Sequence, residues 1–152
     1  MFKKKSDDVL DFRDQTRGPV LTVRTVVCAV LFVLGIAWIA YYYIAVRPEP
    51  GGDPGGPGFL GDLGKWNYVI GFGLSFLGLG LSAHPSTPLG RGRGVVVGML
   101  GCFLVGLVWI CTFYVFSDDL SKLPIFNDLG QWNLVVGIAF MAVGFSFATK
   151  WE

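Results

Sequence analysis

The side chains that most often carry out chemistry are few in this chain and poorly placed for it. There is one histidine, His84, and there are three cysteines, Cys28, Cys102 and Cys111, each inside an apolar run. A lone histidine has no partner ligands for a zinc site, and an odd number of cysteines in apolar runs does not indicate a disulfide framework. Ser-His-Asp, HExxH, CxxC and phosphate-loop patterns do not occur. We therefore expect no enzyme and no catalytic, cofactor or metal site.

One polar motif occurs twice, as DLGKWN at residues 62–67 and as DLGQWN at residues 128–133. In each copy an aspartate, Asp62 or Asp128, stands just before an apolar run. Its carboxylate could accept hydrogen bonds from the free N–H groups at the start of a helix. Asp128 with Gln131 also has the spacing of a capping box. The chemistry predicted for these aspartates is helix capping.

The motif continues with an aromatic and an amide side chain. Trp66 and Trp132 are expected at the membrane interface, where amphipathic rings favour the headgroup layer. Asn67 and Asn133 are expected about one turn into the helix, bonded to a neighbouring helix or to water. These residue types favour a helix start with a membrane anchor, and recognition by a partner protein stays the alternative. The candidate interface residues are Asp62, Trp66, Asn67, Asp128, Trp132 and Asn133.

The elements that must position this motif are apolar. Hydrophobic residues make up 53% of the 152 and charged residues 15%, whereas a soluble domain has about 25% charged residues. Four windows hold no Asp, Glu, Lys or Arg: 25–46, 66–83, 94–117 and 129–149. Each is close to the ~20 residues with which a helix crosses a bilayer. We predict an all-α integral membrane protein with four transmembrane helices embedded in lipid bilayer. The net charge of +1 indicates no nucleic acid partner.

The basic residues predict the orientation in the membrane. With four spans, nine Lys and Arg residues fall on the side of the two termini and three on the other. The positive-inside rule then places both termini in the cytoplasm of a multi-pass plasma-membrane protein. All five tyrosines fall near the opposite, outer ends of the spans and are expected in the headgroup layer. The predicted organisation is a cytoplasmic segment 1–24, a first two-helix repeat 25–84 with a Gly/Pro-rich outer loop 47–65, a cytoplasmic loop 85–93 and a second two-helix repeat 94–152.

The duplication extends beyond the motif. Gly35, Trp38 and Ile39 match Gly106, Trp109 and Ile110 at an offset of 71, whereas the motif repeats at an offset of 66. The difference of five residues lies in the longer outer loop of the first copy. Each copy crosses the membrane twice, so the two repeats are parallel and are predicted to be related by an axis along the membrane normal.

Small residues recur along the predicted spans at intervals that bring helix backbones together. Such faces could pack the four helices against one another, or they could pack against another membrane protein or a second copy of the chain. The sequence leaves these alternatives open. The candidate helix-packing residues are Gly71, Ser75, Gly78, Gly94, Gly98, Gly106, Gly137 and Gly144.

These features together resemble the CrgA family of small actinobacterial cell-division membrane proteins, in a tandem duplicated form. The resemblance covers 94–152 well and 25–84 as a more diverged copy. The residues that carry it are Leu129-Gly130-Gln131-Trp132-Asn133, Ala139-Phe140-Met141 with Gly144, Thr149-Lys150-Trp151, and Gly106-Leu107-Val108-Trp109 of the preceding span.

The resemblance implies a non-enzymatic regulator or scaffold of cell division and septum formation. It implies enrichment at the division septum and contacts with other membrane proteins of the division machinery and with FtsZ. From the residues alone, the alternative is a small four-helix channel or transporter subunit for an uncharged substrate, because no ionisable side chain lies within a predicted span.

Overall fold

The computed structural model describes residues 19–49 and 51–149, and every regular element in this part of the chain is helical. The all-α prediction is confirmed for these residues. Most of the predicted N-terminal segment, residues 1–18, lies outside them. The elements in chain order are α2 (Val23–Tyr41), the π-helical turn η1 (Tyr42–Val46), α3 (Gly58–Leu63), α4 (Trp66–Ser82), α5 (Arg93–Val115), the 3-10 turn η2 (Leu120–Lys122), α6 (Phe126–Leu129) and α7 (Trp132–Ala148).

Two of the helices meet the length and composition of a membrane span. They are Val23–Val46, formed by α2 and η1, and Arg93–Val115, and only 17% and 22% of their apolar windows are buried. The core helix of a soluble protein would be mostly buried, so this exposure favours lipid as the surrounding medium. The apolar helices α4 and α7 are shorter, at 17 residues each, or about 26 Å at 1.5 Å per residue.

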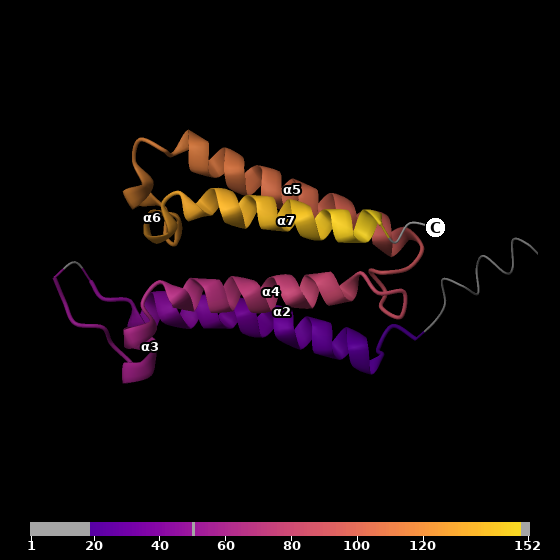
Figure 1. Ribbon diagram of the computed structural model, residues 1–152, viewed down its shortest axis with the longest axis horizontal. Coiled ribbons are helices and arrows are strands. Elements are labelled where there is room, and N and C mark those ends of the chain that lie inside the picture. The colour runs from indigo at the N-terminus through magenta and orange to yellow at the C-terminus, as the bar shows by residue number, and fades with distance from the viewer. Residues whose placement is uncertain (1–18, 50, 150–152) are drawn as a thin grey trace, which may run out of the picture.

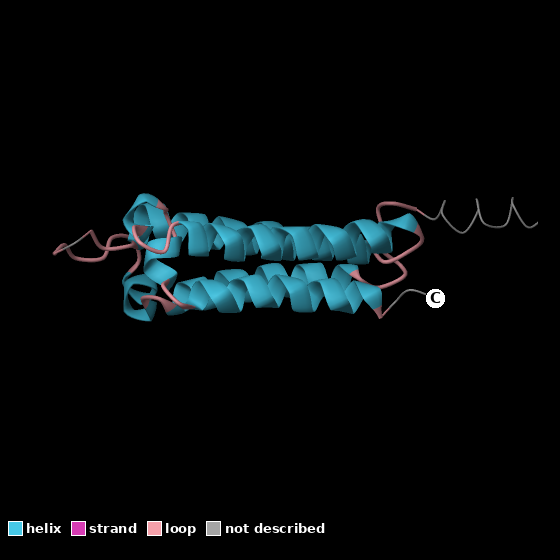
Figure 2. Ribbon diagram, turned by 90° about the horizontal axis from the view of Figure 1, so that it is seen from above, coloured by secondary structure: helices cyan, strands magenta, loops and turns pink. Residues whose placement is uncertain are grey.

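The four long helices form a bundle of two hairpins. In the first hairpin α2 packs along α4, in the second α5 packs along α7, and α4 contacts α7 between them. The short helices α3 and α6 lie at one end of the bundle, and the connection between α4 and α5 lies at the other (Figure 1). The view from above also shows long helices side by side along one axis (Figure 2).

The two hairpins close at glycines in equivalent positions. A Cβ added to Gly71 would overlap the side chain of Ile39, and a Cβ added to Gly137 would overlap that of Ile110. A Cβ on Gly106 would lie 2.7 Å from the carbonyl oxygen of Gly137. The absence of a side chain therefore lets these backbones approach closely. The duplication in sequence is also a duplication in packing.

Most of the other predicted packing residues also face the partner helix of their own hairpin. Gly78 faces the backbone of α2, and Gly98 faces the ring of Phe147. A Cβ added to Gly144 would lie 3.3 Å from the carbonyl oxygen of Met99. Ser75 bonds within its own helix, donating to the carbonyl of Gly71 at 3.0 Å. Gly94 is the exception.

An added Cβ at Gly94 would overlap the carbonyl oxygen of Pro88, in the connection between the hairpins. The expectation that Gly94 packs against another helix is therefore wrong. The physical reason is that Gly94 is only the second residue of α5, where the chain still folds back on its own loop.

Candidate functional site: the α3/α6 end of the bundle

The repeated motif builds a short helix, a sharp reversal and the start of a long helix. The short helix α3 ends at Leu63 and α6 ends at Leu129. The next residues, Gly64 and Gly130, have φ values of 50° and 52°. Positive φ strains residues with a side chain and is freely adopted by glycine. The glycine of DLGxWN is therefore the residue that separates the two helices, a role that spacing arguments missed although positive φ is a common reason for glycine after a helix.

The asparagine of the motif joins the two helices that the glycine separates. Asn67 Nδ2 donates to the carbonyl oxygens of Leu60 at 2.8 Å and Gly64 at 2.9 Å. The asparagine itself is fully buried. The last carbonyls of a helix have no partner inside it, so this amide provides one. The bond to Leu60 agrees with the expectation that Asn67 bonds to a neighbouring helix, which here is the short helix α3.

The second copy repeats this geometry. Asn133 Nδ2 donates to the carbonyl oxygens of Phe126 at 2.8 Å and Gly130 at 2.7 Å, and Asn133 is also fully buried. The indole ring of Trp109 stacks on Phe126 with ring centroids 4.4 Å apart. Asn133 thus holds α6 in place while an aromatic ring covers it.

We expect Asn133→Ala to loosen α6. The substitution removes two hydrogen bonds, while the carbonyl oxygens of Phe126 and Gly130 keep the backbone N–H groups of Gly130 and Asn133 as donors. We expect a cost of about 1–3 kcal/mol of unfolding free energy, since a typical hydrogen bond contributes about 0.5–1.5 kcal/mol. Hydrogen–deuterium exchange of the 126–130 amides should rise in detergent-solubilised protein. Asn127→Ala is the matched control, because Asn127 is exposed on the same short helix. Equal exchange in the two variants would contradict the bracing role of Asn133.

The aspartates of the motif do not cap the long helices. Helix α4 begins at Trp66 after Lys65, and α7 begins at Trp132 after Gln131, and neither preceding residue makes a side-chain capping bond. Asp62 and Asp128 lie inside α3 and α6 instead. The predicted capping box is therefore wrong, because the reversal at the glycine places each aspartate in a separate helix.

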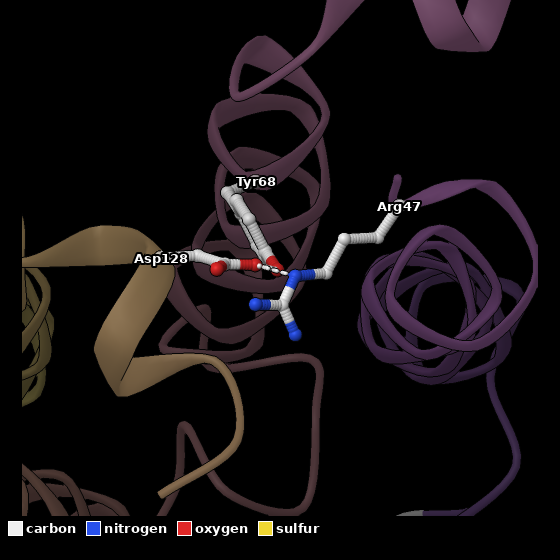
Figure 3. A network of polar contacts seen from close by, with 3 residues as sticks. All are labelled: Arg47, Tyr68 and Asp128. Carbon is white, nitrogen blue, oxygen red and sulfur yellow. Dashed lines mark hydrogen bonds and ion pairs between the residues drawn. The ribbon is translucent and has the colours of Figure 1, made fainter. Parts of the chain in front are cut away.

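Asp128 instead joins the two hairpins. Its Oδ2 atom lies 2.8 Å from Arg47 Nε and accepts a hydrogen bond at 2.7 Å from the hydroxyl of Tyr68 (Figure 3). Arg47 and Tyr68 belong to the first hairpin. Tyr68 is 1% exposed, and the side chains of Arg47 and Asp128 are 29% and 15% exposed. Hydrogen bonds to an ionised carboxylate are short and strong. We call these three residues the clamp.

Apolar contacts surround the clamp. The buried residues of this end, here called the docking cluster, are Ile39, Tyr42, Val46, Leu60 and Tyr68. Two residues on either side of Asp128 pack against this cluster: Ile125, which precedes α6, and Leu129, the last residue of α6. The tyrosines Tyr42 and Tyr68 meet edge to face, with centroids 5.1 Å apart. These two tyrosines lie at the predicted outer end of the bundle, and both are buried in its core.

The residue before α6 has an unusual backbone conformation. Ile125, which precedes it, has a φ of 69°, whereas β-branched residues rarely adopt positive φ. The surrounding structure has to maintain such a conformation, and here the Ile125 side chain packs into the docking cluster. Pattern analysis had no signal for Ile125.

The remaining motif residues face outward. Trp66 and Trp132 are 67% and 65% exposed at the first positions of α4 and α7. Such rings can lie in a headgroup layer or contact a partner. Asp62 is also exposed.

Asp119, in the loop before α6, accepts a hydrogen bond from the hydroxyl of Ser121 and forms an ion pair with Lys122 at 2.9 Å, and these contacts lower the pKa of its carboxyl group.

The polar contacts at this end of the bundle support association between helices. Among residues 19–49 and 51–149, no three His, Cys, Asp or Glu side chains are grouped to hold a metal ion. A shallow groove lies beside α5, and most of the side chains that line it are apolar. They are Leu104, Val105, Val108, Trp109, Thr112 and Phe126. The polar groups that do converge, at the clamp, bind one hairpin to the other.

Fold and site thus define a helical membrane protein made of two similar hairpins, one docked on the other by a short helix. The family model described as "Cell division protein CrgA" matches two successive segments, residues 3–84 and 88–152. The chain therefore belongs to the CrgA family of cell division proteins.

Individual relatives match part of the chain. The cell division protein CrgA of Streptomyces avermitilis is 45% identical over 64 residues, which are 42% of this chain and 71% of that protein. The CrgA protein of Corynebacterium aurimucosum is 41% identical over 49 residues, 32% of this chain and 45% of that protein. The CrgA protein of Mycobacterium sp. (strain KMS) is 32% identical over 57 residues, which are 35% of this chain and 61% of that protein. No solved structure matches the chain.

Proposed function

We propose that this protein is a non-enzymatic scaffold or regulator of septum formation that binds other division proteins through the α3/α6 end of its bundle. Membership of the CrgA family supports the division role. The observation that carries the binding role is the docked α6: one membrane hairpin recognises another through a carboxylate, an arginine and a tyrosine. The exposed side chains of Trp66, Trp132 and Asp62 at the same end support similar contacts with other proteins.

The proposal includes four membrane crossings with both termini in the cytoplasm. The α3/α6 end and the α4–α5 connection lie at opposite ends of the bundle, as alternating crossings require (Figure 1). The excess of Lys and Arg on the side of the connection supports the orientation.

Cysteine labelling tests this topology. In a chain whose natural cysteines are replaced, Ser121→Cys should react with a membrane-impermeant maleimide added to intact cells. Ser86→Cys, in the α4–α5 connection, should react only after the cells are opened. The reverse pattern, or labelling of both positions from outside, would contradict the proposed crossings.

Fluorescent fusion tests the division role. The wild-type chain should concentrate at the septum through contacts with division membrane proteins and with FtsZ, and a uniform membrane signal would contradict the proposal. In Trp66→Ala/Trp132→Ala we expect normal insertion and at least about a halving of the septal enrichment, because each exposed indole can supply one of the aromatic contacts that dominate interfaces. Failure to insert would instead show that the two rings are membrane anchors. Phe145→Ala, an exposed residue near the other end of α7, is the control.

A further inference from the structure

Only one of the two short helices has a surface to dock on. Helix α6 presents Ile125 and Asp128 to the first hairpin. At the motif's offset of 66, their equivalents on α3 are Phe59 and Asp62. Phe59 is 61% exposed, and Asp62 is exposed and makes no hydrogen bond or ion pair with any described residue. The first repeat therefore has the docking side chains, and no residue of 19–49 or 51–149 covers them.

The second hairpin lacks the side chains that would receive them. The residues equivalent to Tyr42, Val46, Arg47 and Tyr68 are Phe113, Ser117, Asp118 and Leu134. The change from arginine to aspartate reverses the charge that Asp62 would meet, and the change from tyrosine to leucine removes the hydroxyl donor. Like charges placed together repel, so α3 has no matching site on its own chain. In Figure 1 it lies at the end of its own hairpin, away from the second one.

We propose that α3 is a docking helix for another membrane protein, and that the partner presents the chemistry of the first hairpin. That chemistry is an arginine directly after the end of a span, a neighbouring tyrosine hydroxyl and an apolar rim. Asp62 accepts from the arginine and the tyrosine, and Phe59 enters the apolar rim as Ile125 does. The inference rests on the proposed scaffold function and specifies its partner. A second copy of this chain is not the occupant, because its own Asp128 already holds its Arg47 and Tyr68.

The test uses the first hairpin as the probe, after its own ligand has been removed. In the full chain, Ile125→Ala with Asp128→Ala frees the docking cluster and Arg47. This receptor variant carries a donor fluorophore at its C-terminus and the wild-type chain carries an acceptor fluorophore at its own. The two chains are mixed in phospholipid vesicles, and their association is followed by energy transfer between the fluorophores. We expect association that weakens at least about tenfold with Asp62→Asn in the wild-type chain, the loss typical of a removed charge pair. Asp118→Asn, an exposed aspartate outside α3, is the matched control.

A charge exchange guards against a misfolded receptor. Asp62→Arg should lose binding to the receptor variant and regain it when the receptor also carries Arg47→Asp. Association that is indifferent to Asp62, or absent in both the original and the exchanged pair, would overturn the proposal. Transfer between two wild-type chains that depends on Asp62 would also overturn it, since the occupant would then be a second copy.

A cellular measurement connects this probe to natural partners. A photo-crosslinking residue at Phe59 should capture a membrane protein at a segment that carries an arginine next to the end of a span, and Asp62→Asn should abolish the product. Capture at a segment without such an arginine would contradict the proposal. Septal localisation of the wild-type fusion is scored separately: if it persists while docking by α3 fails, the proposed function stands and this inference falls.

Discussion

Gly106→Val should separate the second hairpin. The first added atom would lie 2.7 Å from the carbonyl oxygen of Gly137, and further contacts with Phe140 and Met141 follow at 3.1 and 3.2 Å. The nearest obstacle is backbone, so a rotamer change cannot relieve it and α5 must move away from α7. Overpacking of this kind costs about 1–3 kcal/mol. Helix association in lipid depends on close van der Waals contact, so the loss falls directly on the hairpin.

The measurement is unfolding of the purified protein in mixed micelles by increasing SDS, followed by tryptophan fluorescence. Gly101→Val is the matched control, since Gly101 lies in the same helix with nothing within 4 Å of its added Cβ. Both variants exchange glycine for valine inside α5, so the effect on helix propensity cancels in the comparison. A midpoint that falls equally in both variants would show that propensity, and not close packing, sets the stability of the hairpin.

Asp128→Ala should undock the second hairpin from the first while leaving both hairpins intact. The substitution leaves the buried hydroxyl of Tyr68 without its acceptor and Arg47 without its counter-ion. Breaking a buried charge pair costs about 3–5 kcal/mol. The partial exposure of Arg47 and Asp128 reduces this, and we expect about 2 kcal/mol. Spin labels on α2 and α5 should report a wider distance distribution between hairpins, and labels on α5 and α7 an unchanged one.

Asp62→Ala is the control for the clamp, because Asp62 occupies the equivalent position without a partner among the described residues. It should change the stability by less than about 0.5 kcal/mol, as surface substitutions usually do. A double-mutant cycle with Arg47→Ala isolates the Arg47–Asp128 coupling. If Asp62→Ala widened the distance between hairpins as much as Asp128→Ala, the clamp would not be what holds them together.

The four long helices of this protein could be predicted closely from its sequence, whereas the short helices α3 and α6 were not predicted, and α3 lies within the segment 47–65 that was expected to be a loop. The four charge-free windows correspond to the four long helices within a few residues. The reason is that a helix surrounded by lipid needs a continuous apolar run of about 20 residues, and such a run can be recognised from the local sequence. Glycine spacing predicted residues of close approach but left their partner open, and the structure places most of them against the other helix of the same hairpin. Gly94 failed where the chain meets its own loop.

The role of each polar residue was decided by the tertiary structure. The sequence of DLGxWN is compatible with capping by aspartate and with bonding of asparagine across helices. The structure shows no capping by the aspartates, and each asparagine bonds to the short helix of its own repeat. The reversal at Gly64 and Gly130 turns the asparagine back onto the short helix and directs Asp128 to Tyr68, 60 residues away along the chain. The local sequence determines which segments form apolar helices, since the transfer of a segment into lipid depends on its own composition. The partner of a single carboxylate depends on which hairpin lies beside it, and only the packing of the whole chain decides that.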